Sequence, residues 1–219
     1  MLSVASLFAA APTTKPDEGG KSTLIDFESL GADVDNAPSG FTADITGGGD
    51  PQGWRIEEGP PSINGTGGKK QLARRSKDRS ENRSPVCVYD DLSARDVDVT
   101  VHFKALAGTF EQSAGVMVRY QDKDNYYVLR ANAKVGNVAL FKVADGKLEK
   151  LADRSTGVTL NKWQELRLVA RGDAFETFLD DVSLFTAKDG AISDAGKVGL
   201  WTRSDSEAVF DDLRIVVND

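Results

Sequence analysis

Residues 115–132 read GVMVRYQDKDNYYVLRAN, and this stretch contains the pattern that decides the fold. Aliphatic and polar residues alternate on both sides of a short polar run, which is typical of two antiparallel β-strands joined by a tight turn. Each strand carries one arginine opposite its aliphatic residues, Arg119 in the first and Arg130 in the second. An arginine within a sheet is costly unless a partner or a ligand meets it, so the hairpin indicates a polar binding surface.

The same alternation recurs from residue 24 to residue 217, and no segment shows a convincing helical period. Residues 145–146, 172–173 and 180–181 contain only Asp and Gly and predict hairpin turns, because both residue types tolerate positive φ. The predicted strands are 23–28, 54–57, 70–73, 85–89, 96–104, 114–120, 125–132, 137–143, 148–153, 163–171, 175–180, 182–186, 197–202 and 208–217. So many strands without covering helices predict an all-β fold, a two-sheet antiparallel β-sandwich.

This sandwich is predicted to form one domain over residues 22–219, with no internal repeat. The stretches 31–53 and 60–84 are rich in turn-forming residues and are expected to be long surface loops. The predicted core between the sheets consists of Val99, Val101, Val116, Val118, Leu166, Leu168, Val198 and Leu200.

Composition excludes several classes of protein. A net charge of −7 argues against binding to nucleic acid, and no apolar run is long enough for membrane insertion. The only cysteine is Cys87, so an intrachain disulfide is impossible. The only histidine is His102, so a His-rich zinc site cannot be assembled and any histidine-dependent triad would need this residue.

The first twelve residues, MLSVASLFAAAP, have an apolar centre and end in small residues. They resemble the apolar region and cleavage site of a secretory signal, although a basic start is missing. Residues 1–21 are therefore expected to be a signal remnant and flexible leader, and the protein is expected to be periplasmic or extracellular.

Four segments carry a more specific resemblance: residues 97–101 (VDVTV), 115–132, 196–202 (GKVGLWT) and 210–213 (FDDL). With them the chain resembles a bacterial family of concanavalin A-like (LamG-like) jelly-roll domains, often labelled family-16-like glycoside hydrolase or 3-keto-disaccharide hydrolase domains. The resemblance covers about residues 24–217. It implies a jelly roll with one concave sheet and an oligosaccharide or polysaccharide as partner. Lectins, hydrolases, lyases and interaction modules share this scaffold, so activity does not follow from it.

No catalytic residue is assigned. Family-16 glucanases carry a Glu-x-Asp-x-x-Glu strand that places two carboxylates at one scissile bond. The nearest segments here, residues 96–101 and 176–181, do not keep that spacing on one strand face. The opening common in the keto-disaccharide hydrolase branch and the Arg/Gln–His–Tyr set of the alginate-lyase branch are also missing.

Alternation assigns the ligand-binding candidates. His102 lies opposite the valines of residues 97–101, and a row of His102, Arg119, Arg130 and Asn132 on the concave sheet would suit sugar hydroxyls or a uronate carboxylate. Trp201 is added because an aromatic face stacks on a sugar ring. Alternatively, the two arginines could pair with Asp98, Asp122 or Asp124 across strands, and Trp201 could pack in the core.

The resemblance also implies a possible structural calcium where the first and last strands meet, with Glu28 and Asp212 as oxygen ligands. No other cofactor is predicted. Three hypotheses remain open: an exported carbohydrate-binding or interaction domain, a glycoside hydrolase or polysaccharide lyase, and a structural module whose arginines form only ion pairs.

Overall fold

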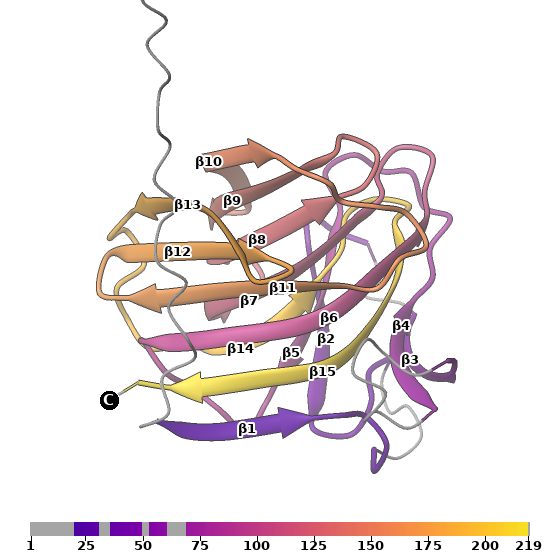
Figure 1. The fold of residues 1–219 in the computed structure, drawn as a ribbon, viewed down its shortest axis with the longest axis horizontal. Coiled ribbons are helices and arrows are strands. Elements are labelled where there is room, and N and C mark those ends of the chain that lie inside the picture. Colours follow the sequence, from indigo (N-terminus) through magenta and orange to yellow (C-terminus); the bar gives the residue numbers. More distant parts are fainter. Residues whose placement is uncertain (1–19, 31–35, 50–52, 61–68, 219) are drawn as a thin grey trace, which may run out of the picture.

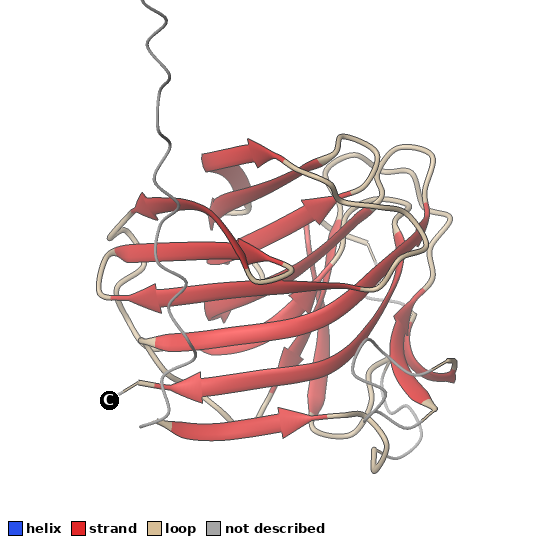
Figure 2. Ribbon diagram, in the orientation of Figure 1, coloured by secondary structure: helices blue, strands red, loops and turns tan. Residues whose placement is uncertain are grey.

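The computed structural model describes residues 20–30, 36–49, 53–60 and 69–218, and its regular elements are all β-strands (Figure 2). The predicted leader lies outside these residues except for Gly20 and Lys21. In chain order the strands are β1 (Lys21–Ile25), β2 (Phe41–Thr46), β3 (Trp54–Glu58), β4 (Lys70–Arg74), β5 (Ser84–Tyr89), β6 (Val97–Ala107), β7 (Ser113–Asp122), β8 (Asn125–Asn132), β9 (Asn137–Ala144), β10 (Lys147–Ser155), β11 (Gln164–Arg171), β12 (Ala174–Leu179), β13 (Val182–Lys188), β14 (Lys197–Trp201) and β15 (Glu207–Val217).

These strands form two antiparallel sheets that pack as a jelly-roll β-sandwich, so the predicted fold class is confirmed (Figure 1). One sheet has eight strands in the order β13-β12-β11-β6-β15-β4-β3, with β1 paired to β15. The other has seven, in the order β10-β9-β8-β7-β14-β5-β2. Figure 1 shows the eight-stranded sheet in front and the seven-stranded sheet behind it.

Three hairpins turn where the sequence predicts. Asp145 and Gly146 join β9 to β10, and Asp180 and Asp181 join β12 to β13, all four with positive φ. Positive φ at both central residues matches the right-handed twist of the flanking strands. Gly172 joins β11 to β12 with a φ of 57°.

The strand β2 was not predicted, because it lies within a stretch rich in Gly, Asp and Pro that indicates a loop. It pairs with β5 along its whole length, from Phe41 opposite Tyr89 to Thr46 opposite Ser84. The alternation of Phe41 and Ile45 with polar residues is the signal that could have identified it.

The core lies between the two sheets, and all eight predicted core positions are fully buried there. A second apolar cluster lies on the outer face of the seven-stranded sheet and includes Met117, Tyr126, Phe141 and Trp201. Met117 belongs to this second cluster while its neighbours Val116 and Val118 belong to the core, as strand alternation requires. In the part of the chain that the structure describes, no helix is long and apolar enough to cross a membrane.

Candidate functional site

The predicted ligand-binding residues do not form one row. His102 lies on β6 in the eight-stranded sheet, whereas Arg119, Arg130, Asn132 and Trp201 belong to strands of the seven-stranded sheet. The sheets lie on opposite sides of the core, so the shared concave face predicted for His102 and the arginines is wrong. Alternation correctly predicts that His102 faces outward from β6, but it does not show which strands share a sheet.

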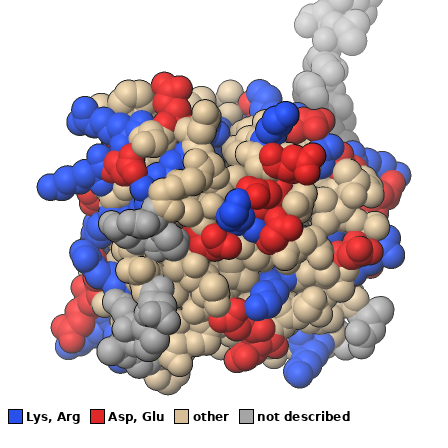
Figure 3. Space-filling view, turned by 180° about the vertical axis from the view of Figure 1, so that it is seen from behind, with Lys and Arg blue, Asp and Glu red and all other residues tan. Residues whose placement is uncertain are grey.

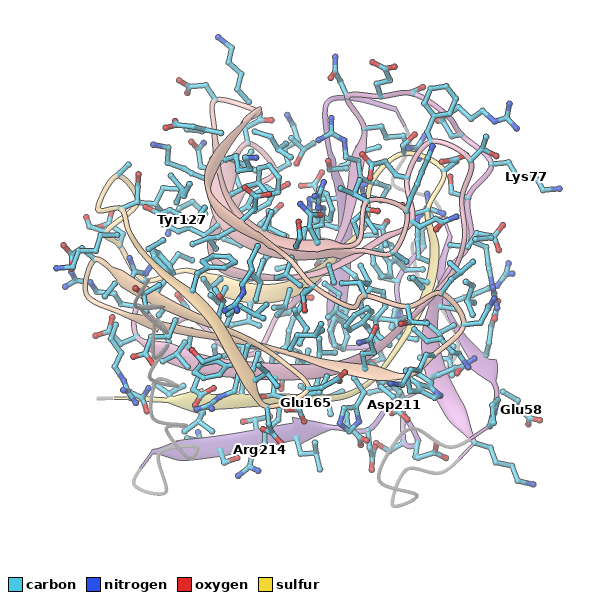
Figure 4. The ribbon with its side chains drawn as sticks, turned by 45° about the horizontal axis from the view of Figure 1, so that its top comes forward. Glu58, Lys77, Tyr127, Glu165, Asp211 and Arg214 are labelled. Atoms are coloured by element: carbon cyan, nitrogen blue, oxygen red, sulfur yellow. The ribbon has the colours of Figure 1, made fainter. Side chains whose placement is uncertain are left out.

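His102 lines a hollow of about 450 Å³ on the outer face of the eight-stranded sheet, which we call the His102 hollow. Four strands contribute to its walls: β1, β6, β11 and β15. The lining residues are Ser22, Leu24, Asp98, Thr100, His102, Glu165, Arg167, Asp181, Asp212, Arg214 and Val216. Glu165 and Arg214 lie on the same side of the sandwich and away from Tyr127 (Figure 4). The hollow thus combines four acids, three basic side chains and a small aliphatic wall.

The floor of the hollow is a buried ion pair. Arg167 donates from Nε to Oδ1 of Asp98 over 2.8 Å and from Nη2 to Oδ2 over 2.6 Å. Its guanidinium also lies 4.8 Å from the ring centroid of Phe178. Such a bidentate pair holds both groups in a fixed orientation. The hydrogen bonds to Asp98 raise the pKa of Arg167 against the effect of burial, so the guanidinium stays charged.

His102 sits between two further carboxylates. Its Nδ1 is 3.0 Å from Oδ2 of Asp212, and its Nε2 is 3.4 Å from Oε2 of Glu165. Burial disfavours the imidazolium, but the hydrogen bonds and charges of Glu165 and Asp212 outweigh it and raise the pKa of His102. Glu165 lies directly opposite His102 in the register of β11 and β6.

A bulge in β15 brings Asp212 to this face. The register with β6 shifts between Asp211 and Arg214, and Asp212 has a φ of 49°. The extra residue allows Asp212 to line the hollow while the adjacent Leu213 stays buried in the core. Alternation predicts the outward positions of Glu165 and Arg167 opposite Leu166 and Leu168, but nothing in the sequence marks them as neighbours of His102.

Trp201 is not available for stacking. It is fully buried in the second apolar cluster and donates from Nε1 to the hydroxyl of Tyr126 over 3.2 Å. The Tyr126 hydroxyl also lies 2.7 Å from Oγ1 of Thr46, and burial raises the pKa of Tyr126 to about 12. This part of the outer face is filled by its own side chains.

Asn132 is likewise fully buried and has protein partners. Its Nδ2 donates to Oε2 of Glu111 and over 3.1 Å to Oγ of Ser113, and its Oδ1 accepts from the amides of Lys134 and Val135. These bonds shape the turn between β8 and β9. The side chain therefore holds a loop rather than an open face.

Arg130 is buried, with 8% of its surface exposed. Its Nη2 donates to Oδ1 of Asn137 over 2.9 Å, and its guanidinium lies 5.1 Å from the ring centroid of Phe141. Neither contact is an ion pair with Asp98, Asp122 or Asp124, the acids suggested by the sequence. Of the five predicted residues, His102 alone lines the His102 hollow.

Arg119 does not face outward, so its assignment opposite Val118 is wrong. The residue has a φ of 52°, and the pairing of β7 with β8 shifts register between Val118 and Asp122. This bulge turns the side chain inward, where it is fully buried and lies 5.5 Å from the ring centroid of Phe175. It donates to three backbone carbonyls, and its nearest carboxylate is Asp96 at 3.4 Å.

The predicted calcium ligands have separate protein partners. Glu28 accepts a hydrogen bond from the amide of Lys70 over 2.6 Å, and Asp212 contacts His102. Among the described residues, no group of three or more His, Cys, Asp or Glu residues could hold a metal ion. Calcium binding by Glu28 and Asp212 therefore remains a prediction without a ligand set in this part of the chain.

Comparisons with known proteins find similarity in sequence to one curated protein and similarity in fold to solved structures. No family model matches the chain. Over 106 residues it is 34% identical to levanase from Bacillus subtilis (strain 168), a match that covers 47% of this chain and 15% of levanase. The chain thus spans a small part of the length of that relative.

Two solved structures share the architecture. The carbohydrate-binding module CBM66 from Bacillus subtilis aligns with a TM-score of 0.60 and 24% identity over 80% of this chain and 94% of the module. Domain 4 of AbnA, a GH43 extracellular arabinanase from Geobacillus stearothermophilus in complex with arabinotriose, aligns with a TM-score of 0.55 and 15% identity. That match covers 80% of this chain and 82% of the domain. At these identities the two structures establish the fold.

Proposed function

We propose that this protein is a carbohydrate-binding domain and that the His102 hollow is its sugar site. The observation that supports this most directly is the pairing of the polar groups in the hollow. Two sets of contacts fix the orientation of these groups before any ligand arrives. Arg167 pairs with Asp98. His102 contacts both Glu165 and Asp212. Groups held in this way lose little conformational entropy on binding.

The chemistry of the hollow suits a neutral sugar. Carboxylate oxygens of Glu165, Asp181 and Asp212 can accept hydrogen bonds from hydroxyls, and Arg214 can donate to hydroxyl oxygens. Leu24, which is 61% exposed, offers an apolar contact for the C–H face of the ring. With both signs of charge on its walls, the hollow does not favour a strongly anionic or cationic ligand.

The similarities give the proposal a substrate class. Levanase and a carbohydrate-binding module are among the proteins that this chain resembles, so levan is the first polysaccharide to test. We further propose that, among concanavalin A-like domains, this one belongs to the LamG-like group that is often labelled family-16-like. We also propose that the protein is exported to the periplasm or the outside of the cell, because residues 1–12 resemble a secretory signal.

A second candidate function is hydrolysis, which Glu165 and Asp212 favour because two carboxylates flank one point of the hollow. Each of them contacts His102, so the arrangement stabilises an imidazolium rather than freeing an acid and a base. Binding without cleavage is therefore the function that the geometry supports better. An assay for reducing ends released from levan and arabinan separates the two candidates.

The proposal is tested by calorimetric titration of the protein with levan oligosaccharides. Arg214→Ala and Leu24→Ala change exposed groups at the rim and are expected to weaken binding about fivefold or more. Arg55→Ala is the matched control, because Arg55 is an exposed arginine on β3, outside the hollow. The proposal fails if both rim variants bind as tightly as the native protein, or if neither levan nor arabinan binds.

A further inference from the structure

A second hollow, of about 490 Å³, opens on the other side of the molecule, at the seven-stranded sheet. It is bordered by Gly47 after β2, by Asn82 before β5, by the hairpin of β9 and β10, and by Arg203 after β14. The two hollows lie on the outer faces of different sheets. A ligand here would therefore be independent of the proposed sugar site.

The charged groups that line this hollow are all basic. Lys147 and Lys150 project from β10, and Arg203 lies opposite; among the described residues that line it there is no Asp or Glu. We call it the cationic hollow. Figure 3 shows that this side of the molecule carries both acidic and basic side chains. The charged residues that line the hollow are of one sign only.

The acids that contact the basic groups of the cationic hollow do not themselves line it. Lys150 contacts Asp153 over 3.0 Å. Arg203 donates from Nε to the carbonyl of Glu81 over 3.1 Å and lies 3.9 Å from Oε1 of Glu111. Lys147 is exposed at the start of β10.

The floor of the cationic hollow is aromatic and aliphatic. Phe141 and Leu148 line it, and the guanidinium of Arg130 lies 5.1 Å from the ring centroid of Phe141. Nε of Arg130 is buried and has no hydrogen-bond partner among the described residues. Burial lowers the pKa of Arg130, the charges of Glu111 and Asp153 raise it in part, and the charge of Arg203 lowers it again. The floor of the hollow is thus backed by a buried guanidinium, which adds to the positive charge of Lys147, Lys150 and Arg203.

We propose that the cationic hollow binds an acidic oligosaccharide through the carboxylate of a uronate residue. The carboxylate would meet Lys147, Lys150 and Arg203, while a C–H face of the sugar ring would lie on Phe141 and Leu148. An apolar floor beside charged donors favours a sugar acid over an inorganic anion, which would use only the charges. A volume near 490 Å³ lies within the roughly 300–1,000 Å³ range of small-ligand sites. This inference extends the proposed function to a second site with a different class of glycan.

Calorimetric titration with trigalacturonate and triglucuronate, each compared with its methyl ester, tests the proposal. The ester keeps the sugar rings and removes the negative charge, so its affinity is expected to be at least about tenfold weaker. Affinity for the acids should fall as salt is raised, because partly exposed charges are screened. A separate titration of the protein with sodium sulfate detects binding of a simple inorganic anion. Equal affinity for acid and ester, equal affinity for sulfate, or no binding of either uronate would overturn the proposal.

Variants then locate the site. Lys147→Gln and Arg203→Gln are each expected to weaken binding of the uronate about fivefold, and the double variant more strongly. Lys188→Gln is the matched control, because it removes the same charge from an exposed lysine on β13, outside the hollow.

Arg214→Ala, at the His102 hollow, should leave uronate binding unchanged, so failure at one site is distinguishable from failure at the other. Thermal melts confirm that each variant is folded. Loss of binding in Lys188→Gln or Arg214→Ala equal to that in Lys147→Gln would contradict the assignment.

Discussion

Replacing Arg119 by methionine is expected to destabilise the sandwich strongly. The guanidinium donates to the carbonyl oxygens of Arg95 at 2.9 Å, Gly172 at 2.6 Å and Ile192 at 3.1 Å. These three residues lie in three different connecting segments, so one side chain ties together the ends of several strands. Methionine keeps much of the packing against the rings of Tyr127 and Phe175 but supplies no donor.

The magnitude follows from the three lost hydrogen bonds. Leaving a buried acceptor without its donor costs about 1–2 kcal/mol, so Arg119→Met should lower the free energy of unfolding by roughly 3–6 kcal/mol. For a domain of about 200 residues, each kcal/mol shifts the melting temperature by about 2–4 °C, which gives a fall of at least about 6 °C.

Calorimetric melting and urea denaturation of the purified variant measure this effect. Arg55→Met is the control, because Arg55 is half exposed and forms a surface pair with Glu57 that is worth about 0–1 kcal/mol. A melting temperature for Arg119→Met within about 2 °C of the native value would refute the reasoning. Such a result would mean that water or a rearranged backbone donates hydrogen bonds to the carbonyl oxygens of Arg95, Gly172 and Ile192 in place of the guanidinium.

Two further predictions concern single residues. Because the folded state raises the pKa of His102, its contribution to stability is fully present below the ordinary histidine pKa and is lost as pH rises through the folded pKa. The difference in unfolding free energy between the native protein and His102→Gln should therefore be larger at pH 6 than at pH 8.5, and a difference that grows with pH would contradict the contacts with Glu165 and Asp212. Cys87 is fully buried, so a thiol reagent should modify it only in denaturant, and rapid labelling of the native protein would show that β5 is not packed as described.

Alternation in the sequence predicts most of the fold, because strand period and turn chemistry are local properties. It places Val116, Val118 and His102 on the correct faces of their strands. It fails at Arg119 and Asp212, where a bulge inserts one residue and reverses the alternation. Neither bulge contains a glycine at its positive-φ position, so the sequence carries no clear signal for it.

The candidate site is harder to predict than the fold, because it depends on which strands share a sheet. His102 and Arg130 look alike in the sequence, as polar residues opposite aliphatic ones, yet they lie on opposite sides of the core. Pairing between β6, β11 and β15 joins residues far apart in the chain and brings Glu165 and Asp212 to His102. Sequence alternation identifies outward positions but not their neighbours across strands.

The central claim, that sugar binds in the His102 hollow, is tested most directly by chemical-shift mapping of the ¹⁵N-labelled protein titrated with levan oligosaccharides. Shifts are predicted to concentrate on the imidazole of His102 and on amides of β1, β6, β11 and β15 around the hollow, while β8, β9 and β10 remain unchanged. Saturable shifts confined to the seven-stranded sheet would contradict the claim, and so would the absence of any shift at saturating oligosaccharide.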